Sequence, residues 1–247
     1  GWILAYVFFT LRGDFAGLTP DGVGTFFGGL LSDHVTMLIW MAITVVSSFF
    51  ITGIGLREGV ERVCKVMMTL LFVLMLALAV NSVFLPGAGA GIKFYLLPDF
   101  GRLLAAKPGE VIFAAMGQAF FTLSLGVGAI AIFGSYAKKE RSLPGESLRI
   151  IGLDTFVALM SGMIIFPACF AFGVNPGAGP GLIFVTLPNI FNQMAGGRLW
   201  GAIFFVFLSF AALTTVIAVF ENIVSYWIDV HGWSRKKASV LNAAAVV

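Results

Sequence analysis

Oxygen-bearing side chains inside apolar stretches are the residues of this sequence that could do chemistry. Thr122, Ser124 and Gly126 stand in the middle of an uncharged run, residues 111–137, which includes FFTLSLGVGAIAIFG. Each glycine in a helix costs about 1 kcal/mol relative to alanine, so this composition weakens a helix at its midpoint. Two interpretations are open: small residues that allow close helix packing, and an unwound segment whose backbone groups hold an ion or an ionised substrate.

A single carboxylate, Asp154, lies inside the apolar run of residues 150–172. An ionised residue at the centre of a bilayer costs at least about 2.5 kcal/mol unless it is paired, so such a residue predicts a functional site. The alternative is a position near the helix end, from which the side chain reaches water. Glu221, in residues 199–228, is similar but closer to the end of its run, and we assign it no direct role.

The motif AALTT places three residues on one side of a helix. Ala211, Thr214 and Thr215 are separated by three and four positions, so they share a face. One main-chain carbonyl and two hydroxyls form a partial oxygen shell, which a small, hard cation prefers. The alternative is that the threonines bond to carbonyls of their own helix, as is common in membrane helices.

The composition requires these residues to be positioned by membrane helices. The chain is 59% hydrophobic and 11% charged, whereas soluble domains have roughly 45–50% apolar and about 25% charged residues. A large soluble domain is therefore excluded. Cys64 and Cys169 have the spacing of neither a disulfide framework nor a metal site. We expect His34 and His231 to be loop residues, and the net charge of +3 to come from loop lysines and arginines rather than from a nucleic-acid patch.

Long apolar runs predict the membrane-spanning helices, since a span needs about 20 such residues. The runs are continuous, which favours helices over the alternating pattern of barrel strands. Because the first and last runs are cut short, we expect an internal piece of a longer protein. The predicted spans are residues 2–11, 35–54, 63–85, 111–137, 150–172, 199–228 and one that begins near Ala238.

The connections between these runs alternate in charge, which predicts their orientation. The positive-inside rule places the more basic set in the cytoplasm. Of the 15 Lys and Arg residues, this set holds Arg57, Arg62, Lys65, Lys138, Lys139, Arg141, Arg149, Arg235, Lys236 and Lys237. The other set contains the turn sequences LPGAGAG and NPGAGPG. The second continues into LIFVTLPNIFNQM, which is apolar but too short to span, so we expect a re-entrant or capping segment on the outer face.

The motifs and their order along the chain resemble those of the neurotransmitter:sodium symporter family, in particular its bacterial amino-acid transporters. The matching stretches are GQAFFTLSLGVGAIAIFGSY, GPGLIFVTLPNIFNQMAGG, FAALTTVIAV and WIDVHGWSRKKA, and they cover most of the chain. The resemblance implies an all-α integral membrane protein with the leucine-transporter-like inverted-repeat fold. Residues 1–247 would form one incomplete transmembrane domain, from the third helix to the start of the ninth, without the first two and the last helices.

The same resemblance implies roles for individual residues. Two sodium sites would each be half present: Thr122 and Asp154 in the first, and Ala211, Thr214 and Thr215 in the second. Gln118 would lie between the ion site and the outer gate, while Tyr136 and Asp229 would belong to the inner gate. The implied substrate-binding residues are Phe121, Thr122, Ser124, Gly126, Val127, Thr215 and Val219.

The expected function is sodium-coupled symport of an amino acid or a related amine across the cytoplasmic membrane by alternating access. Sodium is the expected cofactor, with no organic cofactor and no enzymatic reaction; the expected partners are the substrate and the lipid bilayer, not nucleic acid. Many relatives carry Asn where Asp154 stands, and a fixed carboxylate could replace the charge of chloride, so we expect chloride-independent transport. Val127 and Val219 are modest in size, which predicts a large apolar or aromatic substrate. A non-transporting amino-acid sensor on the same scaffold is the alternative.

Overall fold

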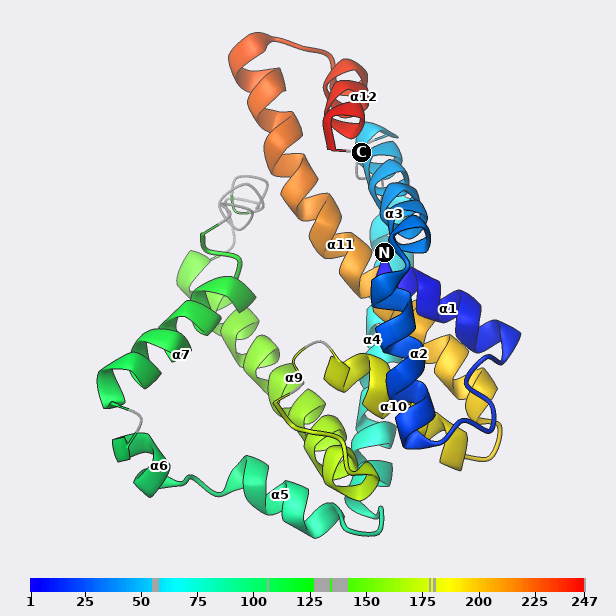
Figure 1. Ribbon diagram of the computed structural model, residues 1–247. Helices are drawn as coiled ribbons and strands as arrows, with labels where there is room; N and C mark the ends of the chain where they lie inside the picture. Colours follow the sequence, from blue (N-terminus) through cyan, green and yellow to red (C-terminus); the bar gives the residue numbers. More distant parts are fainter. Residues whose placement is uncertain are drawn as a thin grey trace.

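A computed structural model describes residues 1–54, 58–105, 107–126, 134, 142–177, 179 and 181–246. The regular elements in these ranges are helices, as the predicted all-α class requires (Figure 1). Their bounds are α1 Trp2–Arg12, α2 Pro20–Ser32, α3 His34–Ile54, α4 Glu58–Val83, α5 Ala88–Leu96, α6 Phe100–Ala105, α7 Pro108–Thr122, α9 Leu143–Phe172, α10 Gly181–Gln193, α11 Gly197–His231 and α12 Arg235–Val246.

Four helices of the described residues are long and apolar enough to cross a membrane: His34–Gly53, Lys65–Val83, Leu143–Phe172 and Gly197–His231. They correspond to four of the predicted spans, but α9 begins at Leu143, before the predicted residue 150. Its first turns carry Glu146 and Arg149, whose side chains pair at 3.2 Å. Hydropathy locates the part of a helix that lies in the membrane, whereas the backbone hydrogen bonds continue beyond it.

The two histidines lie at helix ends rather than in loops, which corrects the prediction. His34 is the first residue of α3, and His231 is the last residue of α11. The His231 ring lies beside Trp227, one turn earlier, with 4.9 Å between the ring centroids. Both histidines are exposed, so neither is a buried ligand.

Aromatic side chains form the core between α1, the connection to α2, and helices α10 and α11. Tyr6 is completely buried. Its ring centroid lies 5.0 Å from that of Phe15, 4.8 Å from Phe184 and 5.3 Å from Phe205. Aromatic pairs at these separations contribute beyond the area that they bury. The predicted outer capping segment forms α10, a helix of 13 residues that packs against α2, α9 and α11.

A second cluster joins α3, α11 and α12, where α12 folds back beside the end of α3 (Figure 1). The rings of Phe49 and Phe220 stack with centroids 3.9 Å apart. Next to them, the Arg235 guanidinium donates to both carboxylate oxygens of Glu221, at 2.7 and 2.8 Å. The Glu221 side chain is only 3% exposed. A bidentate, charge-assisted pair therefore fixes the start of α12 against α11.

Helix α5 lies against α9 through a close backbone approach. A Cβ atom on Gly91 would lie 2.4 Å from the carbonyl oxygen of Phe166 and 2.6 Å from the Cα of Pro167. Farther along α5, the Tyr95 ring stacks on Phe166 with 4.9 Å between centroids. The absence of a side chain at Gly91 is thus what allows the two backbones to meet.

Candidate ion and substrate site

Helix α7 ends in the middle of the uncharged run, at Thr122. Ser124 follows with a φ of 53°, the left-handed conformation that non-glycine residues seldom adopt. Its amide donates to the Phe121 carbonyl at 3.0 Å, and the Leu125 amide donates to the Phe120 carbonyl at 3.1 Å. This pair of bonds is the Schellman motif, which closes a helix and satisfies its last carbonyls. Helix α7 thus ends within the apolar run, as the unwound-segment interpretation requires.

The end of α7 brings Thr122 to Asp154 of α9. The Thr122 hydroxyl lies within hydrogen-bonding distance of both carboxylate oxygens, 3.3 Å from Oδ1 and 3.2 Å from Oδ2. Asp154 is half-buried and has no ion-pair partner among the residues that the structure describes. Asp154 lies beyond the first turns of α9, four positions after residue 150, where the predicted span begins. The result is a negatively charged oxygen cluster at a helix interruption.

The AALTT motif places its three oxygen atoms together, as the spacing predicted. The Thr214 hydroxyl donates to the Ala211 carbonyl at 2.7 Å, and the Thr215 hydroxyl reaches the same carbonyl at 3.3 Å. These are the local bonds of the alternative interpretation, in which threonines bond to their own helix. The arrangement therefore fits both readings: three convergent oxygens that suit a hard cation, and two hydroxyls already satisfied within α11.

The Thr122–Asp154 pair and the α11 oxygens lie in different parts of the structure. Helix α11 packs against α1, α3, α4, α10 and α12, whereas α7 packs against α6. Figure 1 shows α7 crossing near the upper end of α9, whereas α11 lies to the right, beside α3 and α12. The Phe121 side chain is 80% exposed, and Val219 packs beside the Phe49–Phe220 cluster. Those of the predicted substrate contacts that the structure describes are thus not gathered into one enclosed pocket.

The remaining residues predicted to bind substrate or to act in gating are exposed or lie outside the described part of the chain. Gln118 is exposed on α7, and Gly126 is exposed in the turn that follows this helix. Asp229 is exposed near the end of α11. Val127 and Tyr136 lie outside the residues that the structure describes.

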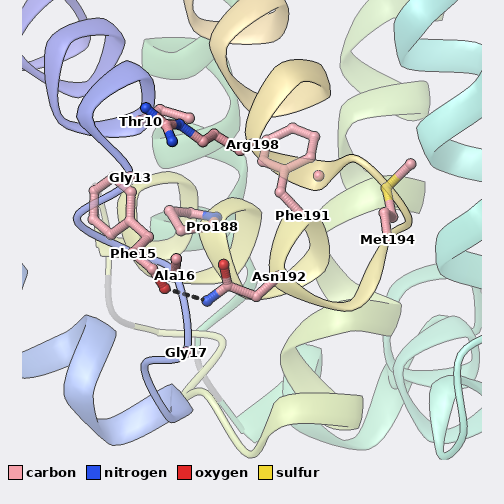
Figure 2. Close-up of a pocket in the computed structure, with 11 residues that line it drawn as sticks. Thr10, Gly13, Phe15, Ala16, Gly17, Pro188, Phe191, Asn192, Met194 and Arg198 are labelled. Carbon is pink, nitrogen blue, oxygen red and sulfur yellow. Dashed lines mark hydrogen bonds between the residues drawn. The ribbon is translucent and has the colours of Figure 1, made fainter.

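Sequence reasoning missed a pocket between the α1–α2 connection, α10 and the start of α11, which is lined by Asn192 and Arg198 together with apolar side chains (Figure 2). It has a volume of about 200 Å³. The Asn192 amide nitrogen donates to the Phe15 carbonyl at 2.7 Å, and Nε of Arg198 donates to the Leu11 carbonyl at 2.9 Å. Each bond joins residues more than 170 positions apart in the sequence. No local sequence pattern could therefore have predicted these two hydrogen bonds.

Comparisons with known proteins agree on one family. Its model, described as the Sodium:neurotransmitter symporter family, matches residues 29–247. A Bacillus subtilis protein, "Uncharacterized sodium-dependent transporter YhdH", is 39% identical over 229 residues, which cover 91% of this chain and 49% of that protein. A Haemophilus influenzae protein, "Uncharacterized sodium-dependent transporter", is 34% identical over 250 residues, which cover 100% of this chain and 54% of that protein.

A solved structure is similar over nearly the whole chain. The crystal structure of MhsT in complex with L-phenylalanine superposes with a TM-score of 0.92 and 41% sequence identity. The match covers 99% of this chain and 55% of that one. This chain therefore spans about half the length of the relatives that it matches.

Proposed function

Because this chain belongs to the sodium:neurotransmitter symporter family, we propose that its protein couples the entry of sodium to the uptake of an amino acid. The resemblance in the sequence and the predicted leucine-transporter-like fold are both confirmed by the family match and by the likeness to MhsT. The names of the bacterial relatives support sodium dependence, and the phenylalanine bound to MhsT supports an amino-acid substrate.

The contact between Thr122 and Asp154 is the observation that carries this proposal. It joins a hydroxyl and a carboxylate from two helices at the point where one of them is interrupted. Interrupted helices in transporters offer ions and substrates the backbone groups that a continuous helix would use. Sodium, when bound, would supply the positive charge that offsets the intramembrane carboxylate. Thr122 and Asp154 would hold it at the first site.

The second sodium site of the proposal is the oxygen face of α11. The Ala211 carbonyl and the hydroxyls of Thr214 and Thr215 are hard oxygen ligands, and the two hydroxyls lie 2.7 and 3.3 Å from the carbonyl oxygen. Hard oxygen ligands suit a cation such as sodium. Each site would then draw its other ligands from outside this chain, because only half of a family member's length is present.

The substrate would bind where α7 ends. The carboxyl end of a helix carries a partial negative charge, which attracts the ammonium group of an amino acid. Ser124 and Gly126 follow this end, and Phe121 precedes it. We propose that Val127, Thr215 and Val219 complete the surroundings of a large apolar or aromatic side chain, which requires α7 and α11 to lie closer together than they do in this structure. Gln118, Tyr136 and Asp229 would act in gating.

Asp154 also supports chloride independence, because its fixed charge would take the place of an anion beside the first sodium.

Alternating access would follow from population shift, in which each ligand moves the equilibrium only by its different affinities for the two states. The proposed location is the cytoplasmic membrane, with Arg235, Lys236 and Lys237 on the inner side. No chemical reaction is part of this proposal.

The test is uptake by the protein at its natural length in sealed proteoliposomes. Radiolabelled phenylalanine, leucine and glycine are offered with an inward gradient of sodium or of choline, each with and without chloride. We expect accumulation of phenylalanine that requires sodium and not chloride. Binding without accumulation would instead support the sensor, and accumulation that ignores sodium would reject sodium coupling.

A further inference from the structure

A groove of about 550 Å³ runs between α3 and α12. Its volume lies within the range of small-molecule sites, roughly 300–1,000 Å³. Its walls are mainly apolar and include three strongly exposed side chains: Val46 at 55%, Phe50 at 68% and Val240 at 67%. An exposed apolar strip of this kind on a membrane-spanning helix is a surface for hydrocarbon.

The two helices that form the groove run in opposite directions. The Arg235 guanidinium reaches the Thr52 carbonyl at 3.4 Å, and a Cβ on Gly53 would lie 3.5 Å from the Ser239 hydroxyl. The end of α3 therefore meets the beginning of α12. Val46 lies seven residues before Gly53, which at 1.5 Å per residue is about 10 Å deeper into the predicted span.

One cation stands at the shallow end of the groove. Lys236 lines it, while its two neighbours are engaged elsewhere: Arg235 with Glu221, and Lys237 over the Trp233 ring at 4.6 Å. The Lys236 ammonium has no ion pair or hydrogen bond within the described part of the chain. By the positive-inside rule, this end faces the cytoplasmic leaflet, where anionic lipids attract basic residues near the surface.

The floor of the groove carries a polar atom as well. Ser239 lines the groove and is 3% exposed, and its hydroxyl has no hydrogen-bond partner among the described residues. Buried polar groups are normally paired, so an unpaired one needs an explanation. A bound molecule with a hydrogen-bonding group beside Ser239 would supply the missing partner.

We propose that this groove binds an anionic phospholipid, with its phosphate at Lys236 and an acyl chain along Val46, Phe50 and Val240. Charge complementarity selects this occupant over a second copy of the chain. In a two-fold dimer the same patch meets itself, so an interface centred on the groove would bring one Lys236 towards the other. A lipid phosphate can pair with the Lys236 ammonium, and the lipid's acyl chain can pack against the apolar strip below it.

The adjacent lysines allow a matched test. The protein at its natural length is purified in detergent and titrated with mixed micelles that contain phosphatidylglycerol or phosphatidylcholine with identical acyl chains. Native mass spectrometry counts the lipids retained. We expect Lys236→Gln to weaken phosphatidylglycerol retention about fivefold, which corresponds to the loss of one basic residue at an anionic surface. Lys236→Arg should restore it, and Lys237→Gln, with the same change of charge, should leave it unchanged.

A second variant tests the acyl-chain part of the site without touching a charge. Val240→Trp places a larger apolar side chain over an exposed position of the groove and should reduce retention of both lipids. Equal phosphatidylglycerol retention by the wild-type protein and Lys236→Gln would overturn the proposal. An equal loss of phosphatidylglycerol retention in Lys237→Gln would also overturn it, because it would indicate an effect of general surface charge. A protein that is dimeric in solution, and whose Val240→Trp variant dissociates without any change in lipid retention, would overturn it as well.

Discussion

The Thr122 hydroxyl and the Asp154 carboxylate, which are 32 residues apart in the sequence, lie 3.2–3.3 Å from each other at the end of α7. This contact links the interruption of one helix to the carboxylate of another. A cation bound between them would be held by two helices at once. Movement of either helix would therefore change its affinity, which is the property that a coupled transporter needs.

Replacing Asp154 by Asn tests the role of its charge. Asp154→Asn keeps the shape and removes the negative charge, and hydrogen bonds to charged groups contribute about 1.5–3 kcal/mol. We expect the sodium affinity, measured from sodium-dependent phenylalanine uptake, to weaken by at least tenfold. Chloride should then stimulate uptake, since an added anion can replace the lost charge. An unchanged response to chloride would reject the compensating role of Asp154.

Thr122 offers a matched pair of substitutions. Thr122→Ser keeps the hydroxyl, whereas Thr122→Val keeps the shape and removes it. A neutral hydrogen bond contributes about 0.5–1.5 kcal/mol, so we expect Thr122→Val to weaken sodium binding by roughly two- to tenfold and Thr122→Ser to stay near the wild type. Sodium titration of phenylalanine binding measures both. If the two variants behave alike, the hydroxyl is not a ligand.

Gly91 and Gly89 provide a controlled test of how α5 docks on α9. The Cβ of Gly91→Ala would meet main-chain atoms of Phe166 and Pro167 at 2.4–2.6 Å, whereas a Cβ on Gly89 has nothing within 4 Å. Overpacking of this kind typically costs about 1–3 kcal/mol. We expect a lower thermal midpoint for Gly91→Ala, with Gly89→Ala equal to or above the wild type. A similar midpoint for both variants would contradict the close approach.

The Glu221–Arg235 pair predicts an asymmetry between its two partners. Removal of Arg235 takes two charge-assisted hydrogen bonds from a carboxylate that is only 3% exposed, while Arg235, at 34%, can turn towards water when Glu221 is removed. Removing one partner of a buried ion pair costs about 3–5 kcal/mol. Arg235→Gln should therefore unfold at a lower temperature than Glu221→Gln. The reverse order, by differential scanning fluorimetry in the same detergent, would contradict the asymmetry expected from burial.

The sequence by itself determined the features that depend on local composition. Membrane helices, a weak point of a helix near Thr122 and the shared face of Ala211, Thr214 and Thr215 follow from hydropathy, from residues that weaken a helix and from the helical period. The structure agrees with each of them. The start of α9 at Leu143 was missed because apolar composition ends before the helix does.

Only the tertiary structure decided which segments meet. It paired Thr122 with Asp154, enclosed Glu221 with Arg235 and joined Arg198 to the carbonyl of Leu11. Helix packing depends on how side chains of two surfaces interdigitate, and no single segment contains that information. The sequence of each segment therefore shows which oxygen-bearing groups it carries, whereas the packing of the helices determines which groups of other segments lie next to them.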